Sequence, residues 1–479
     1  MIIGIDIGTT NVKAVAVDDN MSVLITAERQ NHLLSPYPGW SEHEPEAVLE
    51  NVISVLKDVL KRPDCESPIQ AVVFSSAMHG WLAVDENGNA LTNIWLWSDL
   101  RSDRYARDLR RDQKAPLIYR KTGVPIHAMS PLCKTLWCRS ERPDIFSATY
   151  KILGIKEYVW LRLTGEYCSD LSLASATGLM DIGQNVWASE ALDTASIAED
   201  RLPALVSPGY IKKLPEHYAE KFGLPVGLPL MIGASDGALA NLGSGATETG
   251  HAALTIGTSA AIRIMTNTPL LDGQMRTFCY RLDEKRCIAG GASNNGTNAL
   301  EWLRTGLFHS REQPDTFTHP AAEVLPGAEG LTFLPYLQGE RAPIYDADAR
   351  GALHGLTHEH GQAHIIRAVM EGILYNMKCI AGALEAHSPI DTLHAGGGFS
   401  QNAFWVQMLA DIFQKPVWVG DTNLDASLKG AILFAREVLG LPKLQDDNKG
   451  KYIQPRPGYN DAYREGYDRF SQLAGRLHE

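Results

Sequence analysis

The sequence has few features that would build a disulfide frame, a zinc site or a membrane anchor. Its seven cysteines are an odd number and form no CxxC pair, which indicates free thiols in a reducing compartment. No stretch reaches the roughly 18 consecutive apolar residues of a membrane span. The N-terminus carries no basic region and its first apolar run is broken at Asp6, so no secretory signal is predicted. We therefore expect a cytoplasmic protein.

Positive charge is also scarce. The 479 residues hold 44 Lys and Arg against 56 Asp and Glu, a formal net charge of −12. This balance argues against a nucleic-acid-binding surface and favours small molecules as partners. The GxxxxGK[ST] phosphate loop is missing, so any nucleotide must be bound by a different arrangement. The length exceeds what one hydrophobic core usually supports and favours two domains with a cleft between them.

One acidic residue stands inside an apolar run at the start of the chain. The stretch IIGIDIGTT (2–10) places Asp6 between isoleucines, ahead of a Gly-Thr-Thr turn. An isolated carboxylate in a core is costly, so a partner, a metal or the mouth of a site is expected for it. The β runs on either side of the turn predict a hairpin. Its N–H groups and hydroxyls, with Lys13 nearby, could bind phosphate, although such a hairpin alone is more often structural.

A similar pattern returns near the middle of the chain. LTIGTSAAIRI (254–264) can be laid on IDIGTTNVKAV (5–15) with a constant offset of 249 residues. A four-residue match can arise by chance, but its position predicts a duplicated domain with a boundary near residue 247. Apolar strands alternate with stretches of helical periodicity at 45–62 and 363–386, which predicts the α/β class and a buried helix in the second half.

Three further stretches are candidates for chemistry. MIGASDGALANLG (231–243) sets Asp236 among small residues, where a carboxylate could accept the proton of a substrate hydroxyl; alternatively, Asp236 caps the following helix. Gly396-Gly397-Gly398 permits close approach to an anionic ligand, or close packing of strand and helix. SSAMHGW (75–81) and WSDLR (97–101) gather polar groups and tryptophans that could bind a sugar, or only form structural contacts.

Taken together, these residues resemble the FGGY carbohydrate kinases, a branch of the sugar kinase, Hsp70 and actin superfamily, over essentially the whole chain. GALHGLTHEHGQAHIIRAVME (351–371) fits the C-terminal signature of that family throughout. MSPLCKTLW (129–137) resembles its other signature, except that Thr135 follows Lys134 where a bulky apolar residue is usual. We interpret this difference as a local substitution that leaves the resemblance intact.

The resemblance implies two RNase H-like α/β domains, at 1–247 and 248–479, each with a mixed five-stranded sheet and with the active site in the cleft between them. It implies ATP and Mg²⁺ as cofactors, Asp236 as the catalytic base and Asp6 as the residue that holds the metal through water. It is also compatible with a homodimer. The nucleotide-binding residues that it implies are Thr10, Asn11, Lys13, Thr258, Gly296, Thr297, Gly398, Phe399 and Asn402, and the sugar-side residues are Met78, His79, Trp97, Asp99, Arg101 and Asp236.

Several stretches, including PGWSEHEPE (38–46) and LTIGTSAAIR, are more similar to gluconate kinases than to xylulose kinases, whereas Gly80 is typical of xylulose kinases. The expected reaction is phosphorylation of D-gluconate to 6-phospho-D-gluconate; the alternative is a kinase of xylulose or of another open-chain sugar or polyol. An actin- or Hsp70-like ATPase and a non-enzymatic sugar-binding regulator also stay open. A carboxylate substrate requires a cation, and the candidates are Arg101, Lys134, His79 and His127.

Overall fold

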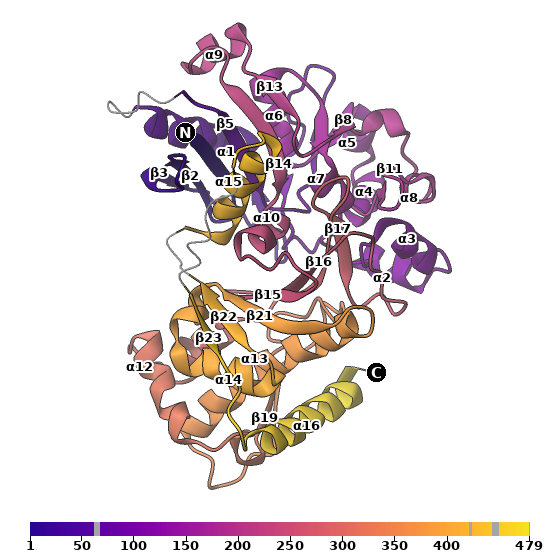
Figure 1. Cartoon of the computed structure of the whole chain (residues 1–479). Helices are drawn as coiled ribbons and strands as arrows, with labels where there is room; N and C mark the ends of the chain where they lie inside the picture. Colours follow the sequence, from indigo (N-terminus) through magenta and orange to yellow (C-terminus); the bar gives the residue numbers. More distant parts are fainter. Residues whose placement is uncertain (62–67, 421–423, 443–449, 479) are drawn as a thin grey trace.

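Two lobes, each built on a mixed β-sheet flanked by helices, make up the molecule (Figure 1). The computed structural model describes residues 1–61, 68–420, 424–442 and 450–478. The sheet of the N-terminal lobe has six strands, in the order β13 (Ile211–Lys213), β14 (Pro229–Ser235), β5 (Ala71–Ser76), β1 (Ile2–Ile7), β2 (Asn11–Val17) and β3 (Val23–Gln30).

The sheet of the C-terminal lobe repeats this topology. In each lobe the first strand pairs antiparallel with the next one, across the Gly-Thr turn, and parallel with a later strand. The predicted hairpins and the duplication are therefore confirmed. The sheets have six and seven strands where five were expected, because β13 extends one of them and β17 and β23 extend the other. The second sheet has the order β17 (Phe278–Arg281), β18 (Cys287–Ser293), β16 (Ala260–Thr266), β15 (Gly250–Ile256), β21 (Ile390–Gly396), β22 (Val417–Gly420) and β23 (Gly450–Ile453).

β1 is apolar on both faces because helices cover both sides of its sheet. Ile3 and Ile5 belong to the cluster that packs under α1 (Pro45–Leu60), whereas Ile2 belongs to the cluster that packs under α15 (Ala426–Val438). Successive side chains of a strand point to opposite faces, so Asp6 shares the face of Ile2. The carboxylate therefore lies on the side of the sheet that α15 covers.

α15 lies in the N-terminal lobe although its residues come late in the chain (Figure 1). It crosses α10 (Asp236–Gly243) so closely that a side chain at Gly430 would collide with the carbonyl of Leu239, and one at Gly243 with the carbonyl of Ala426. Glycine at both positions lets the two backbones touch. The chain thus returns from the C-terminal sheet to the N-terminal lobe, while the boundary predicted near residue 247 lies in the turn between α10 and β15.

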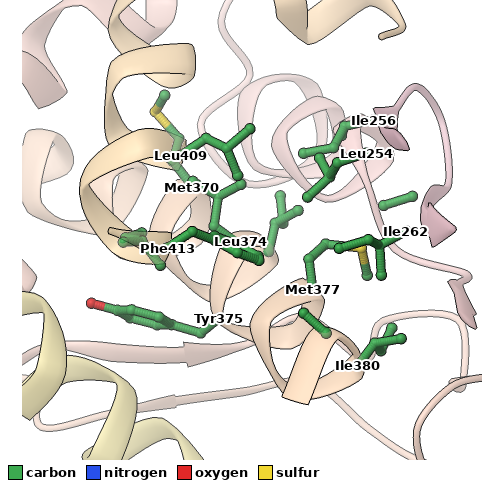
Figure 2. Packing of buried hydrophobic residues seen from close by; sticks show 14 of the residues in the cluster. Leu254, Ile256, Ile262, Met370, Leu374, Tyr375, Met377, Ile380, Leu409 and Phe413 are labelled. Carbon is green, nitrogen blue, oxygen red and sulfur yellow. The ribbon is translucent and has the colours of Figure 1, made fainter. Parts of the chain in front are cut away.

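The core of the C-terminal lobe is organised by α13 (Gln362–Glu385), the helix predicted at 363–386. Figure 2 shows Met377 and Ile380 of this helix facing Ile262 of the sheet, and Met370 facing Leu409 of α14 (Ala403–Phe413). The prediction of a buried core helix is confirmed, because most of α13 is shielded from solvent. The helix predicted at 45–62 is α1, which ends at Leu60.

The remaining elements surround the two sheets. The six cysteines within the described ranges are free thiols, as predicted, and Cys65 lies outside those ranges. Within the described part of the chain, no helix is both long and apolar enough to cross a bilayer. The other helices are α2 (Asp103–Arg111), α3 (Ala115–Thr122), α4 (Pro131–Glu141), α5 (Pro143–Ala148), α6 (Ile155–Thr164), α7 (Leu171–Ser175), α8 (Ser189–Ala195), α9 (Glu216–Phe222), α11 (Thr297–Glu301), α12 (Pro314–Thr318) and α16 (Asn460–His478), and the paired short strands are β4 (Glu42–His43) with β7 (Ile94–Trp95), β6 (Leu82–Val84) with β8 (Lys151–Leu153), β9 (Cys168–Asp170) with β12 (Ala204–Val206), β10 (Met180–Asp181) with β11 (Val186–Trp187), and β19 (Thr332–Leu334) with β20 (Ala352–His354).

Candidate active site

The carboxylate of Asp6 is held by two hydroxyls from distant parts of the chain. Ser75 on β5 donates to Oδ1 at 2.7 Å, and Ser427 on α15 donates to Oδ2 at 3.0 Å. Burial raises the pKa of Asp6 above its usual value, and the two hydroxyls and the charge of Lys13 oppose that rise. Among the described residues each carboxylate oxygen of Asp6 accepts from one hydroxyl, so lone pairs remain on both oxygens.

The first Gly-Thr turn follows Asp6 directly. Gly8 N–H donates to the carbonyl of Asn11 at 3.0 Å and closes the turn, while Thr10 is exposed. Lys13, which is paired with Asp6 across β1 and β2 and is 35% exposed, forms an ion pair at 2.7 Å with Asp425, just before α15. The predicted nucleotide-side residues Thr10, Asn11 and Lys13 therefore lie together beside Asp6.

The second Gly-Thr turn, between β15 and β16, is hydrogen-bonded to residues that follow β18. Gly296 N–H donates to the carbonyl of Thr258 at 3.1 Å, and Thr297 N–H donates to the carbonyl of Gly257 at 2.7 Å. A side chain at Gly296 would lie 2.5 Å from the same Gly257 carbonyl, so the approach requires glycine. The structure thus brings Thr258, Gly296 and Thr297 together.

In the triplet Gly396-Gly397-Gly398, the central glycine is required by close packing, whereas the last glycine has space beside it. Gly397 has φ +86°, and a side chain there would lie 2.5 Å from the carbonyl of Ile256, whereas no atom of the described residues lies within 4 Å of a side chain built at Gly398. Phe399 is 2% exposed and packs edge-on against Trp405. Asn402 accepts from the Trp405 N–H at 3.0 Å and so caps α14. Both side chains are therefore engaged with the protein, while Gly398 has free space.

Asp236 is the first residue of α10, and its carboxylate is not the helix cap. Ser235 occupies that position and accepts from the Ala238 N–H, so the N-cap alternative for Asp236 is wrong. Oδ1 of Asp236 accepts from the Gly237 N–H at 2.6 Å, and Oδ2 has no hydrogen-bond partner within the described ranges. Burial, followed by the charge of Asp6, raises the pKa of Asp236 to about 7, and Arg263 opposes this.

Two of the predicted sugar-side residues lie beside this carboxylate and the first turn. The Cε atom of Met78 lies 2.9 Å from the place where a side chain of Gly237 would begin. Trp97 Nε1 donates to the hydroxyl of Thr9 at 3.1 Å. Met78, Trp97 and Thr9 also line one cavity. The structure therefore brings Met78 and Trp97 to the same place as the first phosphate turn.

His79 is buried and neutral. Its Nδ1 lies 2.8 Å from the carbonyl of Ala176, which assigns the ring proton to Nδ1. Nε2 is then an acceptor, and the Tyr280 hydroxyl lies 3.5 Å from it. Burial lowers the pKa of His79 to about 3, so the ring offers no positive charge to a substrate.

Asp99 and Arg101 are paired inside the N-terminal lobe. Asp99 is 0% exposed and accepts from Arg101 Nε and from one of its terminal nitrogens, each at 2.8 Å. Arg101 also donates to Glu42, and its guanidinium lies 3.7 Å from the ring centre of Trp40 and 4.2 Å from that of Trp95. Nε and one terminal nitrogen of Arg101 therefore have partners already.

Lys134 is also committed to the protein. Its Nζ donates to the carbonyls of His79, Trp95 and Leu96 at 2.7, 3.1 and 2.6 Å, and burial lowers its pKa to about 7. The neighbouring Thr135 hydroxyl accepts from the Trp81 indole at 3.0 Å. This hydrogen bond gives a physical reason for threonine where the family signature usually has a bulky apolar residue.

Sequence reasoning missed two cations of the C-terminal lobe, Arg263 and Arg341. Arg263 lies in β16, and Arg341 lies over the ring of Trp97, 4.8 Å from its centre. Burial is the leading cause that lowers the pKa of each guanidinium. Arg263 carried a signal, because it is a charge inside an apolar strand, as Asp6 is. Arg341 lies in an irregular stretch without periodicity, so no sequence pattern marked it as a site residue.

The fold and this site define a two-domain kinase architecture, and comparisons with known proteins agree. Residues 1–243 match the FGGY family of carbohydrate kinases, N-terminal domain, and residues 252–436 match its C-terminal domain. The gluconokinase of Bacillus subtilis (strain 168) is 39% identical over 446 residues, covering 90% of this chain and 86% of the relative. The xylulose kinase of the same organism is 28% identical over 438 residues, covering 91% and 87%.

Two solved structures are equally similar in shape. The gluconate kinase from Lactobacillus acidophilus has a TM-score of 0.93 at 33% identity, covering 100% of this chain and 98% of that chain. The ligand-bound xylulose kinase from Lactobacillus acidophilus has the same TM-score and identity, covering 99% and 98%. The chain belongs to the FGGY family of carbohydrate kinases. It is a phosphotransferase for a sugar or sugar acid with ATP, so the predicted family and the two RNase H-like lobes are confirmed and the ATPase and regulator alternatives are set aside.

Proposed function

We propose that the protein transfers the terminal phosphoryl group of MgATP to the C6 hydroxyl of D-gluconate, giving 6-phospho-D-gluconate and ADP. The observation that carries the reaction type is Asp236, a carboxylate with one unpaired oxygen and a pKa of about 7 beside Asp6 and Met78. A general base works best when its pKa lies near the operating pH. The observation that favours the sugar acid is the 39% identity to a gluconokinase.

In this proposal Asp236 accepts the proton of the attacking hydroxyl. Its Oδ1 is fixed by the Gly237 N–H at 2.6 Å, which leaves Oδ2 to face the substrate. The negative charge of Asp6 contributes to the raised pKa of Asp236. A cation bound at Asp6 would reverse that contribution and favour ionised Asp236 when the nucleotide is in place.

Asp6 fits the role of holding Mg²⁺. Hard divalent cations prefer carboxylate oxygens, and Mg²⁺ commonly uses one or two carboxylates together with water and substrate phosphates. Asp6 is a half-buried carboxylate with lone pairs left on both oxygens. When bound, the ion neutralises charge on the transferring phosphates. Thr10, Asn11 and Lys13 would bind phosphate at the first turn.

The second turn and the glycine segment would complete the nucleotide site. Thr258, Gly296 and Thr297 would bind the transferring phosphate, since their backbones already converge. We assign the nucleoside to the segment of Gly398, Phe399 and Asn402, with the open backbone at Gly398 as its contact. On the sugar side we assign Met78, His79 and Trp97 to direct contact. We assign Asp99 and Arg101 to support of that surface.

The glycine that argues for a xylulose kinase is not required by the local packing. A side chain at Gly80 would lie 3.5 Å from the Ile155 backbone nitrogen and 3.6 Å from Ile94, in ordinary packing contact. It would therefore pack toward α6 and β7. Gly80, Ile94 and Ile155 line the cavity that Met78, Trp97 and Thr9 also line, so residue 80 affects the size of that cavity without deciding between gluconate and xylulose.

A coupled ADP-release assay tests the proposal. The panel is gluconate, xylulose, ribulose, glycerol, fuculose and rhamnulose, each at several concentrations with MgATP. We expect gluconate to have the highest kcat/KM. A clear preference for a neutral ketose would contradict the gluconate assignment while leaving the kinase class intact. ADP release that no sugar accelerates would contradict the reaction itself.

A further inference from the structure

The side chain of Arg263 is half-buried, and its Nε lies inside the protein. Among the described residues it has no hydrogen bond and no ion pair, and its Nε is shielded from solvent. The Nε lies 3.3 Å from the place where a side chain of Gly237 would begin, next to Asp236. Asp236 attracts it, but no oxygen of that carboxylate comes within 4 Å. A buried Nε–H that has no acceptor among the described residues is costly unless something else binds there.

Arg341 is a second half-buried cation in the same region. One terminal nitrogen donates to the carbonyl of Ser293 at 3.1 Å, whereas Nε is buried and has no partner in the described ranges. Its positive charge lowers the pKa of Arg263, and the charges of both arginines act on Tyr280. Arg263 lies with Met78 beside Gly237, Met78 and Trp97 line one cavity, and Arg341 lies over Trp97, so the two like charges belong to the same region.

His127 adds a third donor. Its Nδ1 accepts from the Met129 N–H at 3.1 Å, which assigns the ring proton to Nε2. That Nε2–H is buried and unpartnered among the described residues, and His127 is 3% exposed. Burial and then nearby arginines, Arg341 among them, lower the pKa of His127 to about 3. The ring is thus a neutral donor close to Arg341.

The neighbouring carboxylate does not serve these donors. Glu340 accepts from the Ser293 hydroxyl at 2.6 Å, from the Asn294 N–H at 2.8 Å and from the Asn376 amide at 3.0 Å. Burial raises the pKa of Glu340 to about 7, so it offsets the charge of Arg341 only in part. The region therefore presents donors and positive charge with too few acceptors.

The position of Arg263 along β16 leaves room for a substrate. It is the fourth residue of the strand, three after Ala260 at the end of the phosphate turn. At about 3.3 Å per residue, its Cα lies about 10 Å from that end. A six-carbon chain whose reacting hydroxyl meets the phosphate can therefore extend toward the guanidinium groups.

We propose that Arg263 and Arg341, assisted by the Nε2–H of His127, bind the carboxylate of a sugar-acid substrate and select it over neutral sugars. A carboxylate supplies both the acceptors and the negative charge that this cluster lacks, whereas the hydroxyls of a neutral sugar supply acceptors only. This inference rests on the proposed function, because it names how the same site recognises gluconate.

The variant Arg263→Met tests the inference, with D-glucitol as the probe. Glucitol is gluconate with a neutral CH₂OH group in place of the carboxylate. The variant should lower kcat/KM for gluconate about 100-fold, mostly through KM, because hydrogen bonds between charged groups are worth this much. The loss for glucitol should be much smaller, because the change that Arg263→Met makes in the pKa of Asp236 affects both substrates alike and cancels in the ratio of the two kcat/KM values. Arg263→Lys should recover part of the loss, and Arg311→Met, an exposed arginine of the same lobe, controls for the lost net charge.

A second readout separates this inference from the proposed function. Gluconate without nucleotide should raise the thermal unfolding midpoint of the wild type and not that of Arg263→Met, because only a bound ligand stabilises the fold. If the wild type prefers a ketose but this difference in midpoint persists, the proposed function is wrong and the anion site stands. If Arg263→Met loses gluconate and glucitol turnover equally, or still gains stability from gluconate, the inference is overturned.

Discussion

Replacing Asp236 with asparagine should abolish turnover and at the same time stabilise the folded protein. Asparagine keeps the shape of the side chain but cannot accept the substrate proton or carry a negative charge. The pKa of Asp236 is raised from 3.8 to about 7, first by burial and then by the charge of Asp6. Ionised Asp236 is therefore disfavoured in the folded state, and its removal relieves that cost.

The sign and the size of the effect follow from this pKa. Because the folded pKa lies above the unfolded one, the folded state keeps a proton that the unfolded state has lost. The wild type therefore loses stability as the pH rises from 3.8 toward about 7. The full penalty is about 4 kcal/mol. Between about pH 5 and about pH 8, the advantage of Asp236→Asn should grow by about 2.6 kcal/mol.

Urea unfolding at these two pH values measures the difference. Most of the ten tryptophans lie before residue 247, so their fluorescence reports mainly on the lobe that carries Asp236. Lys134 and Glu340, whose pKa values are also about 7, act in both proteins and cancel in the difference. Asp108→Asn, at a side chain that is 66% exposed, is the matched control and should show no such growth. A stability gain that does not change with pH, or near-normal turnover in Asp236→Asn, would refute the reasoning.

Two further substitutions probe the metal and the sugar side. Asp6→Asn should lower kcat by about 100-fold or more and weaken its dependence on Mg²⁺, since a hard cation prefers a carboxylate; a magnesium titration of the rate checks this, and an unchanged requirement and rate would count against the role. Lys134→Met should lower the free energy of unfolding by about 3 kcal/mol, because three buried carbonyls lose their donor. Urea unfolding measures that loss, and an unchanged stability would show that these hydrogen bonds do not support the fold.

Local patterns were enough to predict the elements of the fold. The hairpin around Asp6, its copy near Thr258 and the helix α13 follow from period-2 and 3.6-residue patterns with glycine turns between them. The placement of α15 on the first sheet could not be predicted, because it depends on the contact of Gly430 with α10, far away in the sequence. Long-range packing leaves no periodic trace in one chain.

The dependence on long-range contacts also explains which site residues could be predicted from the sequence. Asp6 and Asp236 stood out because a charge among apolar or small residues is unusual. Arg101 looked like an open cation because Glu42, which pairs with it, is distant in the sequence. Arg341 could not be recognised, since its environment is created only when the two lobes meet at Trp97.

The product formed from D-gluconate and MgATP is the most direct test of the proposed reaction. Carbon NMR of that product should show phosphorus coupling at C6 and its neighbour, and ADP should form in equal amount. The assignment would be contradicted if gluconate gave no phosphorylated product while a ketose was phosphorylated rapidly. So would a phosphate on any carbon of gluconate other than C6.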